Sequence, residues 1–413
     1  MQGFRWSSRW MILIAFALLV GMARADEYPP ADHHGNDLVL LSGDVIWGVH
    51  TSVGWFVVVE GTSATVKAYD GTEGTGMFEV HATDIVVSGT LTAQGAGHWG
   101  GGGGGGGGGA SVYGFTGVLS PGHGGFGGLG SGLAPDGFTG SDGRGAFGGP
   151  AAGGNGAAGG NGGGLAGGHG GNGGLAGVAV DGGWGTNGSA GGYLAPGGNG
   201  DHTTNDEVFM GSGGGGGGSG AGGGAGEPGT FGKIAGGGGG SGATGGNGGG
   251  MIKFFAANSL RICGRIDTRG AASGVVGNVG QDGIITLLSA IGGAGANGAN
   301  SAATGGTGAG GLGGHGIADR AIGQGYNGGT GGGSAVGGGG GVLFHCPTLD
   351  GIDLTSGTLD ARGGGNSTVN GGTVKILFTG TDPTTSTVII LAGRVFKDVS
   401  DLILPVRHWE FYR

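Results

Sequence analysis

Three short stretches of this chain alternate apolar and polar side chains with a period of two, and they share one pattern. They read Ser88-Gly-Thr-Leu-Thr-Ala-Gln-Gly95, Cys263-Gly-Arg-Ile-Asp-Thr-Arg-Gly270 and Ser356-Gly-Thr-Leu-Asp-Ala-Arg-Gly363. The same apolar position is held by Leu91, Ile266 and Leu359. Because successive side chains of a strand point to opposite faces, each stretch is predicted to be a half-buried strand with that apolar residue inside. The recurrence indicates a structural repeat.

Further strand-like runs surround these repeats, and two long glycine-rich tracts separate them. Residues 26–95 are predicted to form an N-terminal β region, 251–270 a single β rung and 342–413 a C-terminal β region. The glycine-rich insertions are 96–250 and 271–341. Both tracts begin just after a repeat, as insertions do when they emerge from one face of a solenoid.

The sequence predicts an all-β fold. Strand-like runs such as Phe78–Val80 and Ile85–Val87 are separated by polar residues, and no helical window survives at this glycine density. Strands buried by neighbouring rungs, with no helices between them, predict a parallel β-solenoid (β-helix) core that carries the glycine-rich tracts as insertions. A β-sandwich is the competing arrangement.

The glycine-rich tracts have a period of their own. His123, Phe126 and Leu129 are separated by Gly-Gly pairs, and so are Asn172 and Leu175. A polyproline-II-type helix has three residues per turn, so this spacing places every side chain on one edge and leaves two glycine edges for neighbouring chains. Glycine-rich chains usually behave as flexible linkers. Aromatic residues occur throughout these tracts, however, so we favour packed, polyglycine-II-like insertions.

The Gly-Gly-Asn and Gly-Gly-X runs resemble the glycine-rich part of mycobacterial PE-PGRS proteins, without a PE domain. The alternation of a glycine run, a strand and a stretch such as Ser356–Gly363 is similar to secreted glycine-rich β-helix proteins of environmental bacteria. Polyglycine-II bundles are implied by a resemblance to phage tail-fibre adhesins, snow flea antifreeze protein and the extracellular glycine-rich region of anaplastic lymphoma kinase. This resemblance covers most of the chain after Gly95. It is compositional, so it assigns no functional residue.

Residues 1–25 have the pattern of a secretory signal peptide. Arg5 and Arg9 precede an apolar run over 11–22, and Ala23-Arg-Ala25 matches a cleavage site. The apolar run is short for a membrane span, although an uncleaved anchor is the alternative. We therefore expect a secreted protein, released or held at the cell surface, with no transmembrane segment after cleavage.

Composition and charge exclude two classes of protein. Glycine accounts for 126 of 413 residues, but the chain has only 10 prolines and no strict Gly-X-Y repeat, so it is not collagen-like. Cleavage of the leader would remove three arginines and leave 14 basic against 27 acidic side chains, a net charge of −13. Nucleic acid is not an expected partner, because phosphate contacts require a basic surface.

The chain has two cysteines, Cys263 and Cys346, which do not occupy equivalent positions of the repeat. One disulfide between neighbouring coils is one option, and two free thiols are the other. Two polar stretches, Asp32-His33-His34 and Asp201–Glu207, are the candidates for metal ligands, with solvated loops as the alternative for both. We expect no cofactor.

The outward positions of the repeats carry the one group of charged residues that resembles a catalytic site. Asp267 and Arg269 occupy them in the second repeat, and Asp360 and Arg362 in the third. β-helix lyases and glycosidases use carboxylates on a solenoid face. A ladder of weak surface ion pairs is the simpler interpretation, because the first repeat has Thr and Gln at these positions.

The sequence predicts a secreted, non-enzymatic structural or adhesive surface protein. Its insertions would contact glycans or cell-surface polymers, and the chain could also associate with itself. One alternative is a polysaccharide-acting lyase or glycosidase on the same scaffold, although no G-x-S-x-G, H-E-x-x-H or P-loop motif is present. A second alternative is an ice-binding protein with a flat face of Gly, Thr and Asn.

Overall fold

The computed structural model describes most of the chain between residues 25 and 398. The described residues are 25–114, 118–126, 138–147, 149, 151–158, 171–176, 178, 180, 207–226, 228, 232–272, 276–287, 289–297, 311–319, 323–333, 336–354, 356–366, 370–384 and 388–398. The expected signal peptide, apart from Ala25, lies outside them, as does the end of the chain from residue 399.

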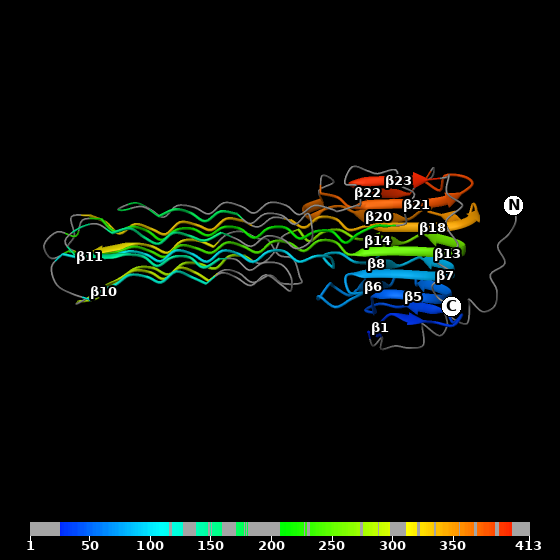
Figure 1. Ribbon diagram of the computed structural model, residues 1–413, viewed down its shortest axis with the longest axis horizontal. Coiled ribbons are helices and arrows are strands. Elements are labelled where there is room, and N and C mark those ends of the chain that lie inside the picture. Colours follow the sequence, from blue (N-terminus) through cyan, green and yellow to red (C-terminus); the bar gives the residue numbers. More distant parts are fainter. Residues whose placement is uncertain are drawn as a thin grey trace.

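The prediction of an all-β chain is confirmed. Among the described residues, one turn of 3₁₀-helix, Gly364–Asn366, is the only helical element. Figure 1 shows two parts, a β body at one end and a long bundle of glycine-rich segments that projects from it. This bundle is called the glycine rod below. It consists of described residues from 96–250 and 271–341.

Two parallel sheets form the β body (Figure 1). Sheet A has the strand order β1 (Glu27–Tyr28), β4 (Val45–Ile46), β6 (Ser63–Val66), β8 (Thr90–Thr92), β14 (Arg265–Asp267), β20 (Thr358–Ala361) and β22 (Ile389–Ala392). Sheet B has the strand order β2 (Ala31–Asp32), β5 (Gly48–Val58), β7 (Met77–Val87), β13 (Met251–Ile262), β18 (Val342–Leu349), β21 (Thr373–Thr379) and β23 (Arg394–Asp398). Two short strands complete sheet B, β3 (Leu38–Leu40) beside β5 and β19 (Ile352–Asp353) beside β13.

The chain alternates between the two sheets. β5 in sheet B is followed by β6 in sheet A, β7 by β8, β13 by β14 and β21 by β22. Each sheet therefore gains a strand every time the chain returns to it. As a result β8 pairs in parallel with β14, although the whole first glycine-rich insertion separates them in the sequence.

The three repeats lie side by side in sheet A. Ile266 of β14 is in register with Leu91 of β8 and with Leu359 of β20, and all three side chains are fully buried. They belong to the main apolar cluster together with phenylalanines of sheet B, of which Phe254 and Phe344 stack with ring centroids 5.6 Å apart. Burial of apolar area between the sheets is the main source of stability in this part of the molecule.

Sheet B has longer strands than the sequence pattern predicts. β7 runs through both Phe78–Val80 and Ile85–Val87 without a break. Between these runs lies Asp84, which is buried and accepts hydrogen bonds from Asn258 and Ser259 of β13. The register between β7 and β13 shifts at this point. A polar corner therefore bends the strands without ending them, which is why an apolar pattern alone divides them.

Three interior segments form the centre of the glycine rod. They are 98–111, 211–224 and 236–249, and they are almost entirely buried. Backbone hydrogen bonds join 98–111 to 211–224 at every third residue. The donors are the N–H groups of His98, Gly101, Gly104, Gly107 and Ala110, and the acceptors are the carbonyls of Gly211, Gly214, Gly217, Gly220 and Gly223.

Each interior segment bonds to neighbours on all sides. Five further N–H groups of 98–111 donate to 138–144 and 293–296, and carbonyls of 98–111 accept from 122–125, 154–157 and 236–248. Segment 236–249 likewise bonds to 98–110, 211–223, 278–281, 293–296, 311–314 and 326–332, and near the body also to Ala271 and Gly338. Successive residues of one segment thus bond in three different directions, as expected for a helix with three residues per turn.

At the closest contacts between interior segments glycine is required because no side chain fits there, not because of its backbone freedom. None of the described rod glycines has φ in the left-handed region. A Cβ atom on Gly106 would lie 2.0 Å from the carbonyl oxygen of Gly239, and one on Gly107 would lie 2.1 Å from that of Gly154. Real Cβ atoms essentially never approach within 3.0 Å. The spacing between interior segments therefore excludes every other residue at these positions.

Short strands close the far end of the rod (Figure 1). One sheet has the order β11 (Gly145–Phe147), β9 (Ser111–Tyr113), β12 (Lys233–Ala235) and β17 (Ile317–Asp319). The other has the order β10 (Val118–Ser120), β16 (Ser289–Ile291) and β15 (Ile284–Ile285). A small apolar cluster that includes Val112 and Ile234 is buried here. This end of the rod is called the tip below.

Candidate functional site

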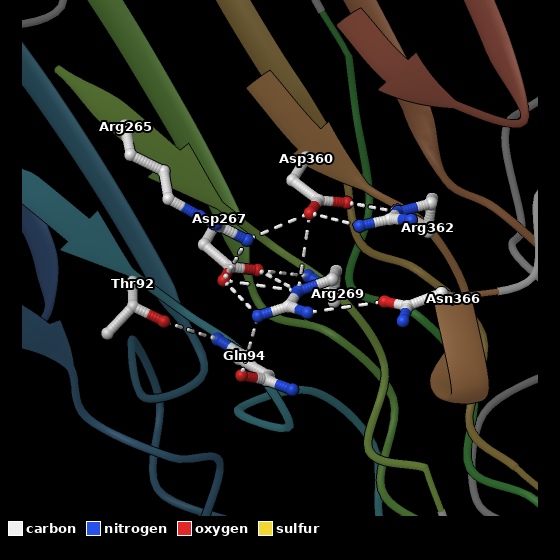
Figure 2. Close-up of polar contacts among 8 residues, drawn as sticks. All are labelled: Thr92, Gln94, Arg265, Asp267, Arg269, Asp360, Arg362 and Asn366. Atoms are coloured by element: carbon white, nitrogen blue, oxygen red, sulfur yellow. Dashed lines mark hydrogen bonds and ion pairs between the residues drawn. The ribbon is translucent and has the colours of Figure 1, made fainter. Parts of the chain in front are cut away.

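The arginine–aspartate constellation lies on the outward face of sheet A. Asp267 of β14 and Asp360 of β20 are in register, each one residue after the buried apolar position of its repeat. Figure 2 shows both carboxylates among three arginines. Arg269 and Arg362 follow their aspartates by two residues, whereas Arg265 precedes Asp267 by two, so strand alternation places all five side chains on this one face.

Ion pairs hold this cluster together within and between strands. Arg269 Nη2 lies 2.7 Å from Asp267 Oδ2, and Arg362 Nη2 lies 2.8 Å from Asp360 Oδ2. Arg265 bridges the strands, because its Nη2 lies 3.1 Å from Asp267 Oδ2 and 2.9 Å from Asp360 Oδ2. These contacts tie β14 to β20.

The first repeat contributes Thr92 and Gln94 to the cluster, but no carboxylate (Figure 2). Arg269 Nη2 donates to Gln94 Oε1 at 3.2 Å, and Arg269 Nη1 donates to Asn366 Oδ1 at 3.3 Å. Thr92 Oγ1 accepts a hydrogen bond from the backbone N–H of Gln94. The outward side chains of all three repeats therefore form one network.

The prediction of an exposed ladder of weak ion pairs is corrected by the burial of its carboxylates. Asp267 is 4% exposed and Asp360 1%, and both carboxylates lie among arginine side chains. Burial alone would raise the pKa of Asp360, but hydrogen bonds from Arg362 and the charges of Arg269 and Arg362 lower it below its usual value. The hydrogen bond to Asp267 raises the pKa of Arg269 in turn. The sequence shows the alternation but not that Arg265 and Arg269 of the second repeat reach Asp360 of the third.

The paired carboxylates are poorly suited to proton transfer. A general acid must carry a proton near the working pH and reach the leaving oxygen. Asp360 has a lowered pKa, and its oxygens already accept hydrogen bonds from Arg265 and Arg362. What this arrangement does well is to hold neighbouring strands together, because Arg265 pairs with a buried carboxylate of each strand.

Comparison with known proteins adds no assignment to this geometry. No protein-family model, curated protein or solved structure matches the chain. Within the described part of the chain, no helix has the length and hydrophobicity needed to cross a membrane. The site is therefore interpreted from its own contacts.

The disulfide option is wrong, because Cys263 and Cys346 are both free thiols. Cys346 follows His345 in β18, which pairs with Phe255 near the middle of β13, whereas Cys263 comes just after the end of β13. Most of the second half of β13 separates them, roughly 20 Å at the rise of a strand. Bridged cysteines have Cα atoms within about 7 Å.

The described metal candidate, Asp32-His33-His34, does not gather a set of ligands. His34 Nδ1 lies 3.4 Å from Asp32 Oδ2 on an exposed turn, whereas His33 Nε2 lies 3.0 Å from Nδ1 of the buried His50. Most of Asp201–Glu207 lies outside the described residues. Among the residues that the structure describes, no three His, Cys, Asp or Glu side chains are placed to hold a metal ion.

A second buried polar cluster, on the outward face of sheet B, is not predicted from the sequence. Glu79 Oε1 lies 2.7 Å from His81 Nε2, and Glu79 Oε2 lies 3.5 Å from Lys253 Nζ. The His81 ring stacks on Phe255 with centroids 4.5 Å apart. Burial alone would raise the pKa of Glu79, but the hydrogen bond with His81 and the charge of Lys253 lower it. The only sequence signal is the period-two spacing of Glu79 and His81 within an apolar run.

The outer surface of the rod presents one side chain in three. In 171–176 and in 311–316, a buried glycine, an exposed residue and a half-buried glycine or alanine follow one another twice. The exposed residues of these two segments are Asn172, Leu175, Leu312 and His315. The surface of the rod is therefore made of these third positions.

Some of these third-position side chains bond to the backbone of the next segment. Asn155 Oδ1 accepts a hydrogen bond from the N–H of Ala176 at 3.0 Å, and Asp142 Oδ1 accepts one from Gly124 at 2.7 Å. The side chains of Asp282, Asn297 and Asn327 do the same. These contacts, called staples below, give the frequent Asn residues of the glycine-rich tracts a structural role that a linear repeat does not reveal.

Proposed function

We propose that this chain is a secreted, non-enzymatic structural or adhesive protein that holds the tip of a polyglycine-II-like rod away from a β-solenoid body. The solenoid is supported by the alternation of the chain between two parallel sheets and by the register of the three repeats. The rod is supported by hydrogen bonds that recur at every third residue. Such a protein presents its tip to glycans or other cell-surface polymers.

The observation that carries the adhesive role is an exposed leucine on a clamped loop at the tip. Leu287 is 85% exposed. Lys233 of β12 is buried, and its Nζ donates to the carbonyl oxygens of Thr286 at 2.7 Å and Leu287 at 2.9 Å. The same Nζ lies 3.8 Å from Asp319 Oδ2. A buried cation thus fixes the loop, so the exposure of Leu287 is built into the tip.

Two further large apolar residues are exposed on the tip strands. They are Ile284 of β15 and Ile317 of β17, and these two strands are in contact. Exposed apolar groups on a soluble protein mark contact sites when they gather in one place. The C–H faces of sugar rings are a suitable counterpart, because they offer apolar area beside hydroxyl groups.

The two alternative functions have weaker support. A polysaccharide-acting enzyme on this scaffold would need an available carboxylate, but Asp267 and Asp360 are both paired with arginines. Ice binding calls for a regular array of one kind of side chain. The third positions of the outer segments instead mix Phe, Leu, His and Asn.

Binding of the mature protein to insoluble polymers and whole bacterial cells tests the proposal. Chitin, cellulose, peptidoglycan and bacterial cells are the probes, with the bound fraction measured over a concentration series. We expect binding to at least one probe and at least about a tenfold loss of affinity in the double variant Ile284→Asn, Leu287→Asn. Leu349→Asn, on an exposed apolar residue of the body, is the control. Absence of binding to every probe, or binding unchanged by the tip variant, would contradict the adhesive role.

A further inference from the structure

Large apolar side chains are exposed around the rod, well away from the tip loop. The five most exposed of them are Phe126 (71% exposed), Phe138 (64%), Leu175 (78%), Val279 (62%) and Leu312 (64%). Each belongs to a different outer segment. This set is called the apolar girdle below.

Hydrogen bonds to the interior show that Phe126 and Phe138 lie at one level of the rod. Gly105 donates to the carbonyl of Phe138, and Gly125, next to Phe126, donates to Gly106. The two segments are also direct neighbours, because Gly140 donates to Gly125. The two aromatic rings therefore start from adjacent segments at the same height.

Leu312 and Val279 lie at the same level on other segments. The backbone N–H of Gly311, just before Leu312, donates to the carbonyl of Ser241. The N–H of Ser241 in turn donates to the carbonyl of Asn278, just before Val279. The N–H of Gly242 donates to the carbonyl of Gly104. These two segments run in opposite directions, so Ser241 is level with Gly105. The two aliphatic side chains thus match the height of the two aromatic ones.

Leu175 completes the girdle. The backbone N–H of Gly174, just before Leu175, donates to the carbonyl of Ser219. The N–H of Gly107 donates to the carbonyl of the next residue, Gly220. The five side chains therefore lie within about two residues of one another along the rod, or about 6 Å at the rise of this type of helix. They form a ring and not a patch on one face.

A polar ring lies one turn nearer the tip. It contains His123, Asp142, Asp282 and His315. The segment of Asp142 lies next to that of His123, with His123 Nδ1 3.4 Å from Asp142 Oδ2, and the segment of Asp282 lies next to that of His315. Acidic and imidazole groups thus alternate around the rod just above the apolar girdle.

We infer that copies of this chain associate side by side through the apolar girdle, with their rods pointing the same way. In that arrangement apolar girdles meet at one height, and an aspartate of one polar ring can face a histidine of the next. Because girdle residues lie on five segments around the rod, one neighbour covers only part of them. Contacts of this kind do not close at a dimer, so the association continues to larger assemblies.

Other occupants fit the girdle less well. One turn of the rod is about 9 Å long, whereas the hydrocarbon core of a bilayer is about 30 Å thick, so the girdle does not match a membrane. A partner that binds one face would leave the other girdle residues exposed. Self-association does not depend on what the tip binds, so this inference and the adhesive function can fail separately.

Sedimentation velocity of the mature protein over a concentration series tests the inference. We expect assemblies larger than dimers to form as the concentration rises. The quadruple variant Phe126→Asn, Phe138→Asn, Leu175→Asn, Leu312→Asn should weaken association by at least about 100-fold, because each substitution removes an apolar side chain that association would bury. Asparagine is chosen because it already occupies third positions at Asn155 and Asn172. Leu349→Asn, outside the rod, should leave association unchanged.

A second measurement keeps the test independent of the quadruple variant. Leu312→Cys in a background of Cys263→Ser and Cys346→Ala should form disulfide-linked dimers under mild oxidation, whereas Leu349→Cys in the same background should not. A protein that stays monomeric at every concentration would overturn the inference, as would assembly that survives the quadruple variant. Binding of monomers to neutral phospholipid vesicles through the girdle would also overturn it, in favour of a lipid surface.

Discussion

In the β body, backbone hydrogen bonds lie within two sheets, and side chains such as Phe254 and Ile266 fill the space between them. In the glycine rod, backbone groups bond to neighbours in six directions, and no side chain fits between interior segments at positions such as Gly106. The first region has a core of side chains, and the second has a core of backbone. Both are ordered, so a high glycine content is compatible with a defined structure when the glycines recur with the period of a helix.

This difference changes what a mutation does in each region. Removing atoms from a side-chain core leaves a cavity, whereas adding one atom to a backbone core forces segments apart. The body should therefore be sensitive to large-to-small substitutions and the rod to small-to-large ones. The predictions below test this contrast.

Phe254→Ala should have the largest effect, because it removes a fully buried ring from the centre of the body. We expect the free energy of unfolding to fall by about 3–5 kcal/mol. Chemical denaturation followed by tryptophan fluorescence would measure it. Leu349→Ala, at a residue that is 68% exposed, should change little. A comparable loss in both variants would mean that Phe254 is not a core residue.

Gly107→Ala should be nearly as damaging, because its methyl group would lie 2.1 Å from the carbonyl oxygen of Gly154. We expect a loss of about 3 kcal/mol, concentrated in the rod. Gly149→Ala is the matched control, because nothing lies within 4 Å of its added Cβ. Hydrogen exchange of rod amides would locate the effect. Equal tolerance of both alanines would argue against close packing of the interior segments.

Acid should weaken the body before the rod. Burial lowers the pKa of His50 to about 4 from an ordinary value of 6.5. The unfolded chain therefore binds this proton more readily, so the stabilisation is complete above about pH 6.5 and is lost as the pH falls toward 4. The loss is at most about 3 kcal/mol.

Denaturation of wild type and His50→Gln across this pH range would check the effect. The substitution should flatten the dependence, although His33, whose pKa burial also lowers, keeps part of it. An unchanged slope in His50→Gln would assign the acid sensitivity to other groups.

Asp360→Asn should cost less, about 2 kcal/mol, because the arginines that lose their partner remain partly exposed to water. The loss should appear in the repeats of sheet A and leave the rod intact. Thermal unfolding of the variant beside Asp382→Asn, whose ion pair with Lys397 is more exposed, would measure it. Equal effects of the two substitutions would mean that burial of the cluster adds nothing.

Asn155→Ala should have the smallest effect, about 1 kcal/mol, because it removes one staple, the hydrogen bond to the N–H of Ala176. The amide of Ala176 should exchange faster, while interior amides stay protected. Leu175→Ala, which also changes a third position but removes no staple, should leave that exchange rate unchanged. If the Ala176 amide exchanged at similar rates in the wild type, Asn155→Ala and Leu175→Ala, the staples would have no structural role.

The fold could be predicted from the sequence where its pattern is local. Alternation with a period of two is enough to place Leu91, Ile266 and Leu359 inside and their neighbours outside. The burial of Asp267 and Asp360 was not predictable in the same way, because contacts such as those of Arg265 and Arg269 with Asp360 form only after β14 and β20 pair. Cys263 and Cys346 show the same limit, because their separation follows from the register of β18 on β13.

A spacing of three predicts the edge on which a side chain lies but not what that edge faces. Asn172 and Leu175 are exposed on an outer segment, whereas Ser241 and Thr244, with the same spacing, are fully buried in an interior one. Which segments become interior depends on how the whole rod assembles. The sequence also gave no sign of the apolar girdle, because its members lie on five segments that hydrogen bonds bring to one level.

Hydrogen–deuterium exchange of residues 26–413 tests the central claim, that the rod has an ordered core of backbone. Mass spectrometry would compare peptides from 98–111 and 236–249 with peptides from β7 and β13. If the claim holds, the interior rod amides are protected as strongly as those of the body strands. In the outer segments, about one amide in three should exchange without protection. Complete exchange of 98–111 and 236–249 within seconds, with β7 and β13 still protected, would contradict it.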